Sequence, residues 1–227
     1  MFIWLSNFVK KIKTNLLSVP TIEAVYHLWK RDKVVDIFRP HLGGYKPGGD
    51  FATEVTPLWE YFYRVLGCRT ALDVGCAEGW AIKAMMEIGY DAYGIEGLPK
   101  ALSRSPCPDR ITIHDLTKKP YLSGKKYDLV WCSEVVEHIK EAFVGNVVLT
   151  LAGNCGRYLA MTYAPPGSGG YHHVNCQPEE YWIKHIEAAG LRYDPDLTYL
   201  ARELVRTKCK GFRHFAERGL VFVRGER

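Results

Sequence analysis

The sequence has no closely paired cysteines, no long apolar run and no strong charge of one sign, and each absence excludes a class of protein. Its seven cysteines are an odd number without Cys-x-x-Cys spacing, which argues against a disulfide framework and against a cysteine zinc site. A reducing compartment, the cytoplasm, is therefore the expected location. A net charge of +5 permits an anionic substrate without requiring one. No internal repeat or low-complexity tract is visible, so a repeat architecture is not expected.

The amino-terminal residues are apolar but form too short a run to span a bilayer. Met1-Phe-Ile-Trp-Leu5 is followed, not preceded, by charges, which is the reverse of a signal peptide. One helical face would carry five apolar residues, opposite Lys10 and Lys13: Leu5, Phe8, Val9, Ile12 and Leu16. Such a helix either covers the domain or lies on a membrane surface. We expect the first and regard membrane contact as the minor alternative.

The chain divides into a helical extension, residues 1–55, and an α/β domain, residues 56–227. The extension should contain two helices, residues 2–17 and 22–38, and a lid-like loop, Arg39–Asp50, rich in glycine and proline. Strands are predicted at residues 70–74, 92–95, 111–114, 127–132 and 157–163, then from 192 and over 219–224. Helices are predicted at residues 56–66, 80–88, 98–103, 135–154 and from 177 to about 190, with an irregular basic stretch over 202–213. This alternation predicts a doubly wound parallel sheet with helices on both faces.

The most informative stretch is Ala71-Leu-Asp-Val-Gly-Cys-Ala-Glu-Gly79, a buried strand running into a glycine turn. Gly75 and Gly79 allow a tight turn and let a ligand approach bare backbone, while the following helix offers unpaired N–H groups. An acid inside the turn, Asp73, suits a ligand with a cationic group. Glu96 ends the next strand 21 residues after Gly75, where a carboxylate would meet a ribose diol.

These residues together resemble the class I S-adenosylmethionine-dependent methyltransferases from about Pro57 to the C-terminus. Asp73-x-Gly75-x-Ala77-x-Gly79 is similar to that family's first motif, although Ala77 stands where many members have glycine. Glu96 is similar to its ribose-binding acid and Asp115 to its adenine-side acid. The resemblance implies a seven-stranded sheet whose last strand, Gly219–Arg224, is antiparallel. It also implies a set of cofactor-binding residues: Asp73, Gly75, Cys76, Ala77, Gly79, Glu96, Gly97, Asp115, Leu116 and Ser133.

The acceptor side should lie after the fourth strand, at Cys132-Ser-Glu-Val-Val-Glu-His138. The candidate catalytic residues are Glu134, His138, His172 and His173, with an imidazole as general base. Glu134, Glu137, His138 and His172, or His173 in its place, would be the ligands if Mg²⁺ or Mn²⁺ binds. This grouping resembles the metal site of ubiquinone-pathway catechol O-methyltransferases and of small-RNA 3′-terminal 2′-O-methyltransferases. A site without metal is the favoured alternative, because carboxylates at a helix N-terminus have a structural use of their own.

We therefore expect a methyltransferase that transfers the methyl group to an oxygen, or to a nitrogen, of a small-molecule or sugar-like acceptor. The first alternative is a metal-dependent 2′-O-methyltransferase on RNA ends, against which stand the modest charge and the lack of an RNA-binding module. The second alternative is a catalytically silent partner subunit that only binds adenosylmethionine. The oligomeric state stays open at this point.

Overall fold

The structure is a computed structural model that describes residues 33–36 and 38–225. Most of the two expected amino-terminal helices lie outside these residues. Lys33–Asp36 and Phe38 are described and are not helical, so the expectation of a helix reaching Phe38 was wrong at its end. None of the helices in the described part has the length and apolarity that crossing a membrane requires.

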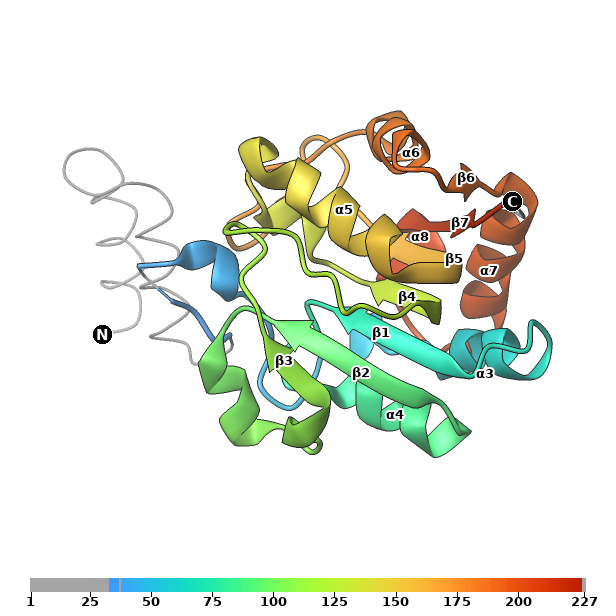
Figure 1. The fold of residues 1–227 in the computed structure, drawn as a ribbon, viewed down its shortest axis with the longest axis horizontal. Coiled ribbons are helices and arrows are strands. Elements are labelled where there is room, and N and C mark those ends of the chain that lie inside the picture. The colour runs from blue at the N-terminus through green and yellow to red at the C-terminus, as the bar shows by residue number, and fades with distance from the viewer. Residues whose placement is uncertain (1–32, 37, 226–227) are drawn as a thin grey trace.

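The centre of the fold is a seven-stranded sheet with helices on both faces, as predicted (Figure 1). The strands are β1 (Thr70–Val74), β2 (Asp91–Glu96), β3 (Ile111–Ile113), β4 (Tyr127–Cys132), β5 (Cys155–Thr162), β6 (Arg192–Tyr193) and β7 (Gly219–Val223). Their order is β3-β2-β1-β4-β5-β7-β6. The first five strands pair in parallel, and β7 is antiparallel to both of its neighbours. The order reverses between β1 and β4, which is the switch point where open α/β sheets bind ligands.

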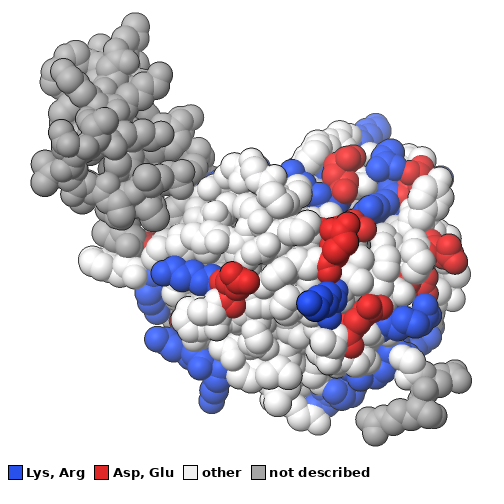
Figure 2. Space-filling view, turned by 90° about the horizontal axis from the view of Figure 1, so that it is seen from above, with Lys and Arg blue, Asp and Glu red and all other residues white. Residues whose placement is uncertain are grey.

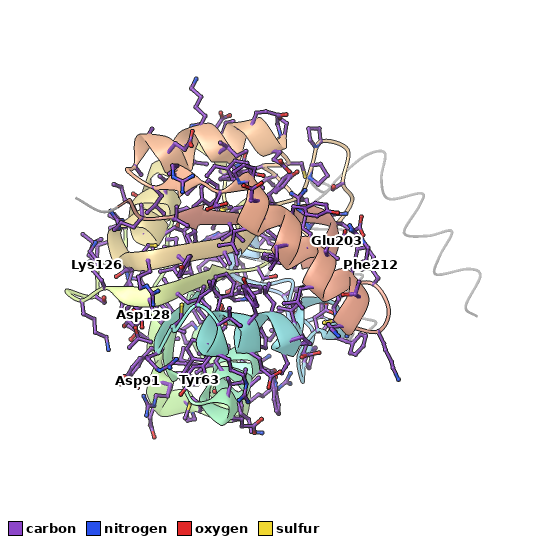
Figure 3. All side chains as sticks on the ribbon, turned by 90° about the vertical axis from the view of Figure 1, so that its right-hand side faces the viewer. Tyr63, Asp91, Lys126, Asp128, Glu203 and Phe212 are labelled. Carbon is purple, nitrogen blue, oxygen red and sulfur yellow. The ribbon has the colours of Figure 1, made fainter. Side chains whose placement is uncertain are left out.

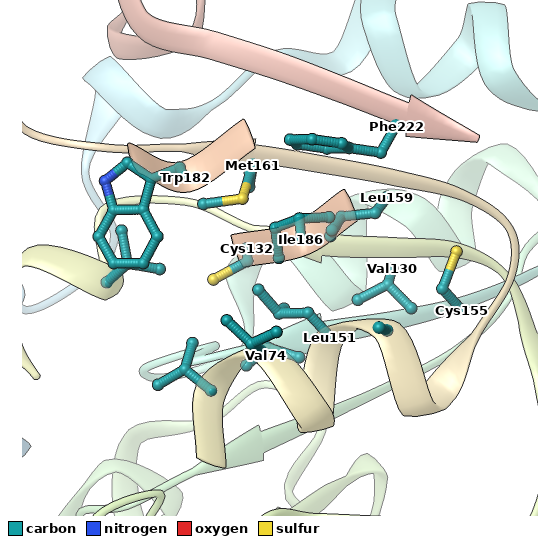
Figure 4. Close-up of a cluster of buried hydrophobic side chains, with 14 of the residues drawn as sticks. Val74, Val130, Cys132, Leu151, Cys155, Leu159, Met161, Trp182, Ile186 and Phe222 are labelled. Carbon is teal, nitrogen blue, oxygen red and sulfur yellow. The ribbon is translucent and has the colours of Figure 1, made fainter. Parts of the chain in front are cut away.

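Each sheet face carries its own apolar core. The helices are α3 (Thr56–Arg64), α4 (Trp80–Ile88), α5 (Val144–Asn154), α6 (Glu179–Ala188), α7 (Pro195–Lys208) and α8 (His214–Arg218). On one face, residues of α5 and α6 such as Leu151 and Ile186 pack against Val74, Val130 and Phe222 of the sheet (Figure 4). On the other face α3, α4, α7 and α8 form a second core around Trp131. Burial of both strand faces explains why β4 reads as a continuous apolar run.

Two further predictions about helices were wrong. A continuous helix over residues 135–154 was expected, but Val136–His138 and Glu141–Phe143 are separate 3₁₀ turns, and α5 begins only at Val144. The helix does not continue because the Glu137 carbonyl oxygen accepts hydrogen bonds from the backbone N–H groups of Val174 and Asn175 instead. The helix expected at residues 98–103 is likewise a 3₁₀ segment, Pro99–Arg104.

The stretch expected to be irregular, residues 202–213, is mostly helical. It belongs largely to α7, whose N-cap Asp194 accepts a hydrogen bond from the Leu197 N–H and whose first residue is Pro195. Both residues favour a helix start. The buried face of α7 consists of Thr198, Ala201 and Val205, at helical spacing. The basic residues obscured this pattern in the sequence.

Candidate active site

A cavity of about 730 Å³ opens at the carboxyl ends of the parallel strands. Residues that follow β1, β2, β3 and β4 line it, together with the loop from His41 to Phe51 and two residues of α8, His214 and Arg218. In Figure 1 the segment before α3 lies at this edge of the sheet. Figure 3 also shows the other end of the parallel strands. Asp91 and Asp128, at the beginnings of β2 and β4, lie there, on the side of the molecule away from Phe212, which precedes α8.

The turn after β1 has the backbone conformation that the glycine motif predicts. Gly75 and Gly79 have φ angles of 79° and 85°, a region that favours glycine. A Cβ atom on Gly75 would stand 2.4 Å from the Val135 side chain, so only glycine fits between the two loops. Ala77, where many class I methyltransferases have glycine, also has a positive φ of 49°. The turn therefore holds a strained alanine at its middle position.

The two acids of the cofactor motif lie buried in the cavity wall. Burial, and then the charge of Glu96, raises the pKa of Asp73 to about 8. The Glu96 carboxylate accepts hydrogen bonds from the N–H groups of Ala77 and Leu98, at 2.9 and 2.8 Å. Burial raises the pKa of Glu96 despite these bonds. A buried carboxylate with a raised pKa favours a cationic ligand, because a nearby positive charge stabilises the ionised acid.

The remaining predicted cofactor residues divide into two groups. Several line the cavity beside the acids: Gly75, Cys76, Ala77, Gly97, Leu116 and Ser133. Gly79 and Asp115 are not among the lining residues. Asp115 instead accepts hydrogen bonds from the Thr117 N–H and hydroxyl and lies 3.2 Å from the His41 imidazole. The turn contact fits the local capping role that aspartate often has.

A third buried acid, Glu78, connects the cavity wall to the loop over it. One of its oxygens accepts hydrogen bonds from the Gly48 N–H, at 2.8 Å, and from the Trp80 indole, at 3.0 Å. The other oxygen has no hydrogen-bond partner among the described residues. Glu78 was not predicted as a site residue. Its position inside the glycine turn, between Gly75 and Gly79, was the signal that could have indicated it.

Glu134, after β4, is held in a strained conformation beside a histidine that the sequence analysis missed. Its φ angle is 56°, unusual for a residue other than glycine. Its N–H donates to the Thr162 hydroxyl, and that hydroxyl donates back to its carboxylate. The other carboxylate oxygen lies 3.2 Å from Nδ1 of His214. Over-determined strain of this kind is common at functional sites. His214 lies in α8, beyond the stretch that was expected to be irregular.

Two of the three predicted histidines, His138 and His173, line the acceptor side of the site. The rings of His138 and His173 meet edge to face with centroids 5.0 Å apart, and both line the cavity. Burial, followed by the neighbouring His173, lowers the pKa of His138 to about 3. Burial likewise lowers the pKa values of His172 and His173 to about 4. All three imidazoles are therefore neutral near pH 7. His172, a predicted catalytic residue, does not line the cavity.

The expected metal ligands are only partly brought together. Within the described residues, the group that could hold a metal ion is Glu137, His138 and His173, whose ligand atoms all lie within 4.8 Å of one another. Glu134 and His172, two of the four expected ligands, are not in this group. Glu137 is fully buried, and burial, together with the charge of Glu134, raises its pKa well above the ordinary value. The set of ligands differs from the expected one because the helix is broken after Val135. Glu137 and His138 lie in a 3₁₀ turn, so their side chains have other directions than in the expected α-helix.

Solved structures with this fold include methyltransferases of different substrates. One is the sugar N-methyltransferase KedS8 from Streptoalloteichus sp. ATCC 53650, at 18% identity and a TM-score of 0.59, covering 88% of this chain and 93% of the other. Another is the magnesium protoporphyrin IX methyltransferase ChlM from Synechocystis PCC 6803 with bound SAM. It has 19% identity and a TM-score of 0.54, covering 93% of this chain and all of the other, 100%. At these identities the likeness shows the fold. None of the curated protein sequences compared matches this chain significantly.

A family model described as a methyltransferase domain matches residues 47–152, which include the glycine turn, both motif acids and Glu134. Residues 47–152 therefore match a methyltransferase domain, and the fold around them is that of class I S-adenosylmethionine-dependent methyltransferases. The resemblance, the predicted fold class and the prediction of an enzyme are thereby confirmed. The roles of individual site residues in this methyltransferase stay predictions.

Proposed function

We propose that this methyltransferase transfers the methyl group to a hydroxyl of a small-molecule or sugar-like acceptor. The observation that carries the proposal is the set of neutral imidazoles, His138, His173 and His214, that lines the cavity beside Glu134. A hydroxyl must lose its proton as the methyl group is transferred, and a neutral imidazole or a carboxylate can accept that proton. An amine acceptor in its neutral form has the same need, so N-methylation is the near alternative.

The cofactor supplies a methyl group bound to a cationic sulfur. The buried carboxylates of Asp73, Glu78 and Glu96 suit its charged and hydroxyl groups, because they lie in the cavity wall and one Glu78 oxygen has no hydrogen-bond partner among the described residues. The loop from Gly43 to Asp50 would cover this half of the cavity and exclude water. Glu134 and the imidazoles would orient the acceptor hydroxyl and receive its proton. The protein's contribution is then mainly positioning and proton removal.

A metal-assisted reaction is the second candidate, and a specific observation favours it. Glu137, His138 and His173 offer one carboxylate and two imidazoles at a spacing that a divalent ion can bridge. If Mn²⁺ or Mg²⁺ bound there, it would lower the pKa of an acceptor hydroxyl. An RNA acceptor is less favoured. On the face shown in Figure 2, Lys and Arg residues lie interspersed with Asp and Glu and form no continuous basic surface.

The experiment that tests the proposed function is a screen for S-adenosylhomocysteine release. The purified protein is incubated with adenosylmethionine and pools of hydroxylated small molecules, sugars, amines and short RNAs, each with excess chelator or with Mn²⁺. We expect release with a hydroxylated small molecule or sugar, at full rate in chelator. Release only with RNA or amines would contradict the proposed acceptor. Strict dependence on Mn²⁺, together with a Mn²⁺-induced rise in melting temperature that His173→Ala abolishes, would favour the metal-assisted candidate.

A further inference from the structure

Arg218 places a positive charge in the wall of the cavity on the acceptor side. It is the last residue of α8 and follows His214 by four positions, so the two side chains share a helix face. Both line the cavity. His214 contacts Glu134, the residue that follows β4 at the acceptor side. The guanidinium of Arg218 therefore lies near the groups that would receive the acceptor's proton.

Arg218 is the exception among the shielded arginines of the described residues. Arg110 and Arg202 pair with carboxylates, of Asp91 and Glu179. Arg213 and Arg224 donate to backbone carbonyls, of Glu54 and Cys155 among others. For the half-buried Arg218 no hydrogen bond or ion pair is formed within the described part of the chain. A guanidinium has five N–H donors, and removing them from water without acceptors costs free energy.

The nearby carboxylates do not satisfy this charge. The Glu134 carboxylate already accepts a hydrogen bond from Thr162 and lies 3.2 Å from Nδ1 of His214. Glu137 is fully buried, and its carboxylate oxygens form no hydrogen bond or ion pair with Arg218. Glu217, the neighbour in α8, lies near Arg206 and points to solvent. A carboxylate or phosphate brought by a ligand would therefore be the natural partner.

Charged residues of both signs line the cavity, including Glu134 on the acceptor side. Its cofactor half contains three buried acids, Asp73, Glu78 and Glu96. On the acceptor side Lys33 and Arg218 both line the cavity and both interact electrostatically with His173. His173 thus lies within the field of two cations that line the same cavity. The three buried acids suit a cationic cofactor, and the two cations suit an anionic group on the acceptor.

We propose that the acceptor carries an anionic group, a carboxylate or a phosphate, which Arg218 binds beside the hydroxyl that is methylated. This inference rests on the proposed function, since it names the substrate class of the same site. A planar guanidinium can bind either group through two parallel hydrogen bonds. Bidentate binding would fix the orientation of the acceptor, which methyl transfer requires. Lys33 would add attraction without a fixed geometry.

The direct test uses small anions and needs no knowledge of the acceptor. Inorganic phosphate and acetate are titrated into the protein saturated with S-adenosylhomocysteine, and binding is followed by calorimetry and by NMR of the arginine side chains. We expect saturable binding that Arg218→Gln weakens at least about tenfold and Arg218→Lys weakens less. Arg192→Gln is the matched control, because it removes the same charge from an exposed pair with Asp194. Absence of binding, or equal binding to Arg218→Gln and wild type, overturns the inference.

The second arm compares acceptors in pairs that share one skeleton. Hydroxy acids and sugar phosphates are tested against their neutral amides and parent sugars, with S-adenosylhomocysteine release as the readout. The anionic member should be preferred, and Arg218→Gln should lower its kcat/KM about 10- to 100-fold more than that of the neutral member. Preference for neutral acceptors overturns the inference and leaves the proposed function intact. Failure to bind adenosylmethionine at all would instead overturn the proposed function.

Discussion

The buried position of Asp73 favours the binding of a cationic ligand but destabilises the ligand-free protein. It is almost fully buried and its pKa is raised to about 8 by burial and by Glu96. In the folded protein it therefore holds a proton at pH 7 that it would release when unfolded. A bound cationic ligand would lower the pKa of Asp73 and release this proton, because its charge favours the ionised acid.

The pH dependence of cofactor binding follows from this shift. Since only the ionised Asp73 attracts the cation, affinity for adenosylmethionine should rise by up to about tenfold per pH unit below pH 8 and level off above it. Calorimetric titrations of wild type between pH 6 and 9 give the slope. The slope should disappear in Asp73→Asn, together with most of the affinity. A flat profile in wild type would show that Asp73 is not the group that meets the cation.

The same shift predicts a gain in stability for Asp73→Asn. An acid with a raised folded pKa stabilises the fold while protonated, and that contribution is lost as pH rises from the ordinary value of 3.8 to about 8. At pH 8.5 the free energy of unfolding of the ligand-free variant should exceed that of wild type by about 1 kcal/mol or more. Urea unfolding at pH 8.5 and at pH 6 measures it, and the gain should be larger at pH 8.5. A less stable variant at pH 8.5 would contradict the raised pKa.

At the scale of elements, the loop before α3 and the turn after β1 are held together by Glu78. The contacts are the Gly48 N–H and the Trp80 indole on one carboxylate oxygen. Gly44, Gly48 and Gly49 have positive φ angles, so the loop takes a course that most residues could not follow. The loop thus has few anchors and one specific contact to the cofactor motif.

This arrangement predicts that the loop Gly43–Asp50 becomes ordered when the cofactor binds. Hydrogen exchange of its amides should slow on addition of S-adenosylhomocysteine. Glu78→Gln, which keeps the shape but weakens the acceptor, should reduce this protection. Glu87→Gln, an exposed acid paired with Lys83 on α4, is the matched control. Equal exchange with and without ligand would make the loop an ordinary connector.

Helix α8 is anchored in the core by Phe215. Phe215 is almost fully buried and stacks on Trp131 of β4, with ring centroids 5.2 Å apart and an interplanar angle of 17°. Phe215→Ala should lower the free energy of unfolding by about 3–5 kcal/mol, because it removes a large core side chain. Phe215→Leu should cost less and keep His214 and Arg218 near the cavity. Denaturant unfolding separates the two variants, and a loss below about 1 kcal/mol for the alanine variant would contradict the contact.

At the scale of the whole molecule, the fold was largely predictable from local patterns. Buried apolar strands such as Tyr127–Cys132 and the glycine turn after Val74 have signatures that lie within a few residues of one another. The break in the helix after Val135 was not predictable, because it depends on hydrogen bonds between Glu137 and a segment almost 40 residues later, at Val174. The helix α7 had a capping signal, but its charges concealed it.

The candidate site was predictable in its cofactor half and only partly in its acceptor half. The motif acids come from two adjacent strands, so their spacing along the chain reports their position. His214 and Arg218 reach the cavity from α8, about 80 residues after Glu134, because β7 returns between β5 and β6. No local pattern links such distant residues. The same long-range folding explains why His173, and not His172, joins Glu137 and His138.

The most direct measurement of the central claim is calorimetric binding of S-adenosylhomocysteine to wild type and to Glu96→Ala. We expect one-to-one binding to wild type. In the variant the binding free energy should be weaker by about 1.5–3 kcal/mol, since a charge-assisted hydrogen bond to the ribose is removed. Glu60→Ala, an exposed acid on α3, should bind like wild type. NAD should not compete. Unaltered affinity in Glu96→Ala, or binding of NAD in place of S-adenosylhomocysteine, would contradict the account.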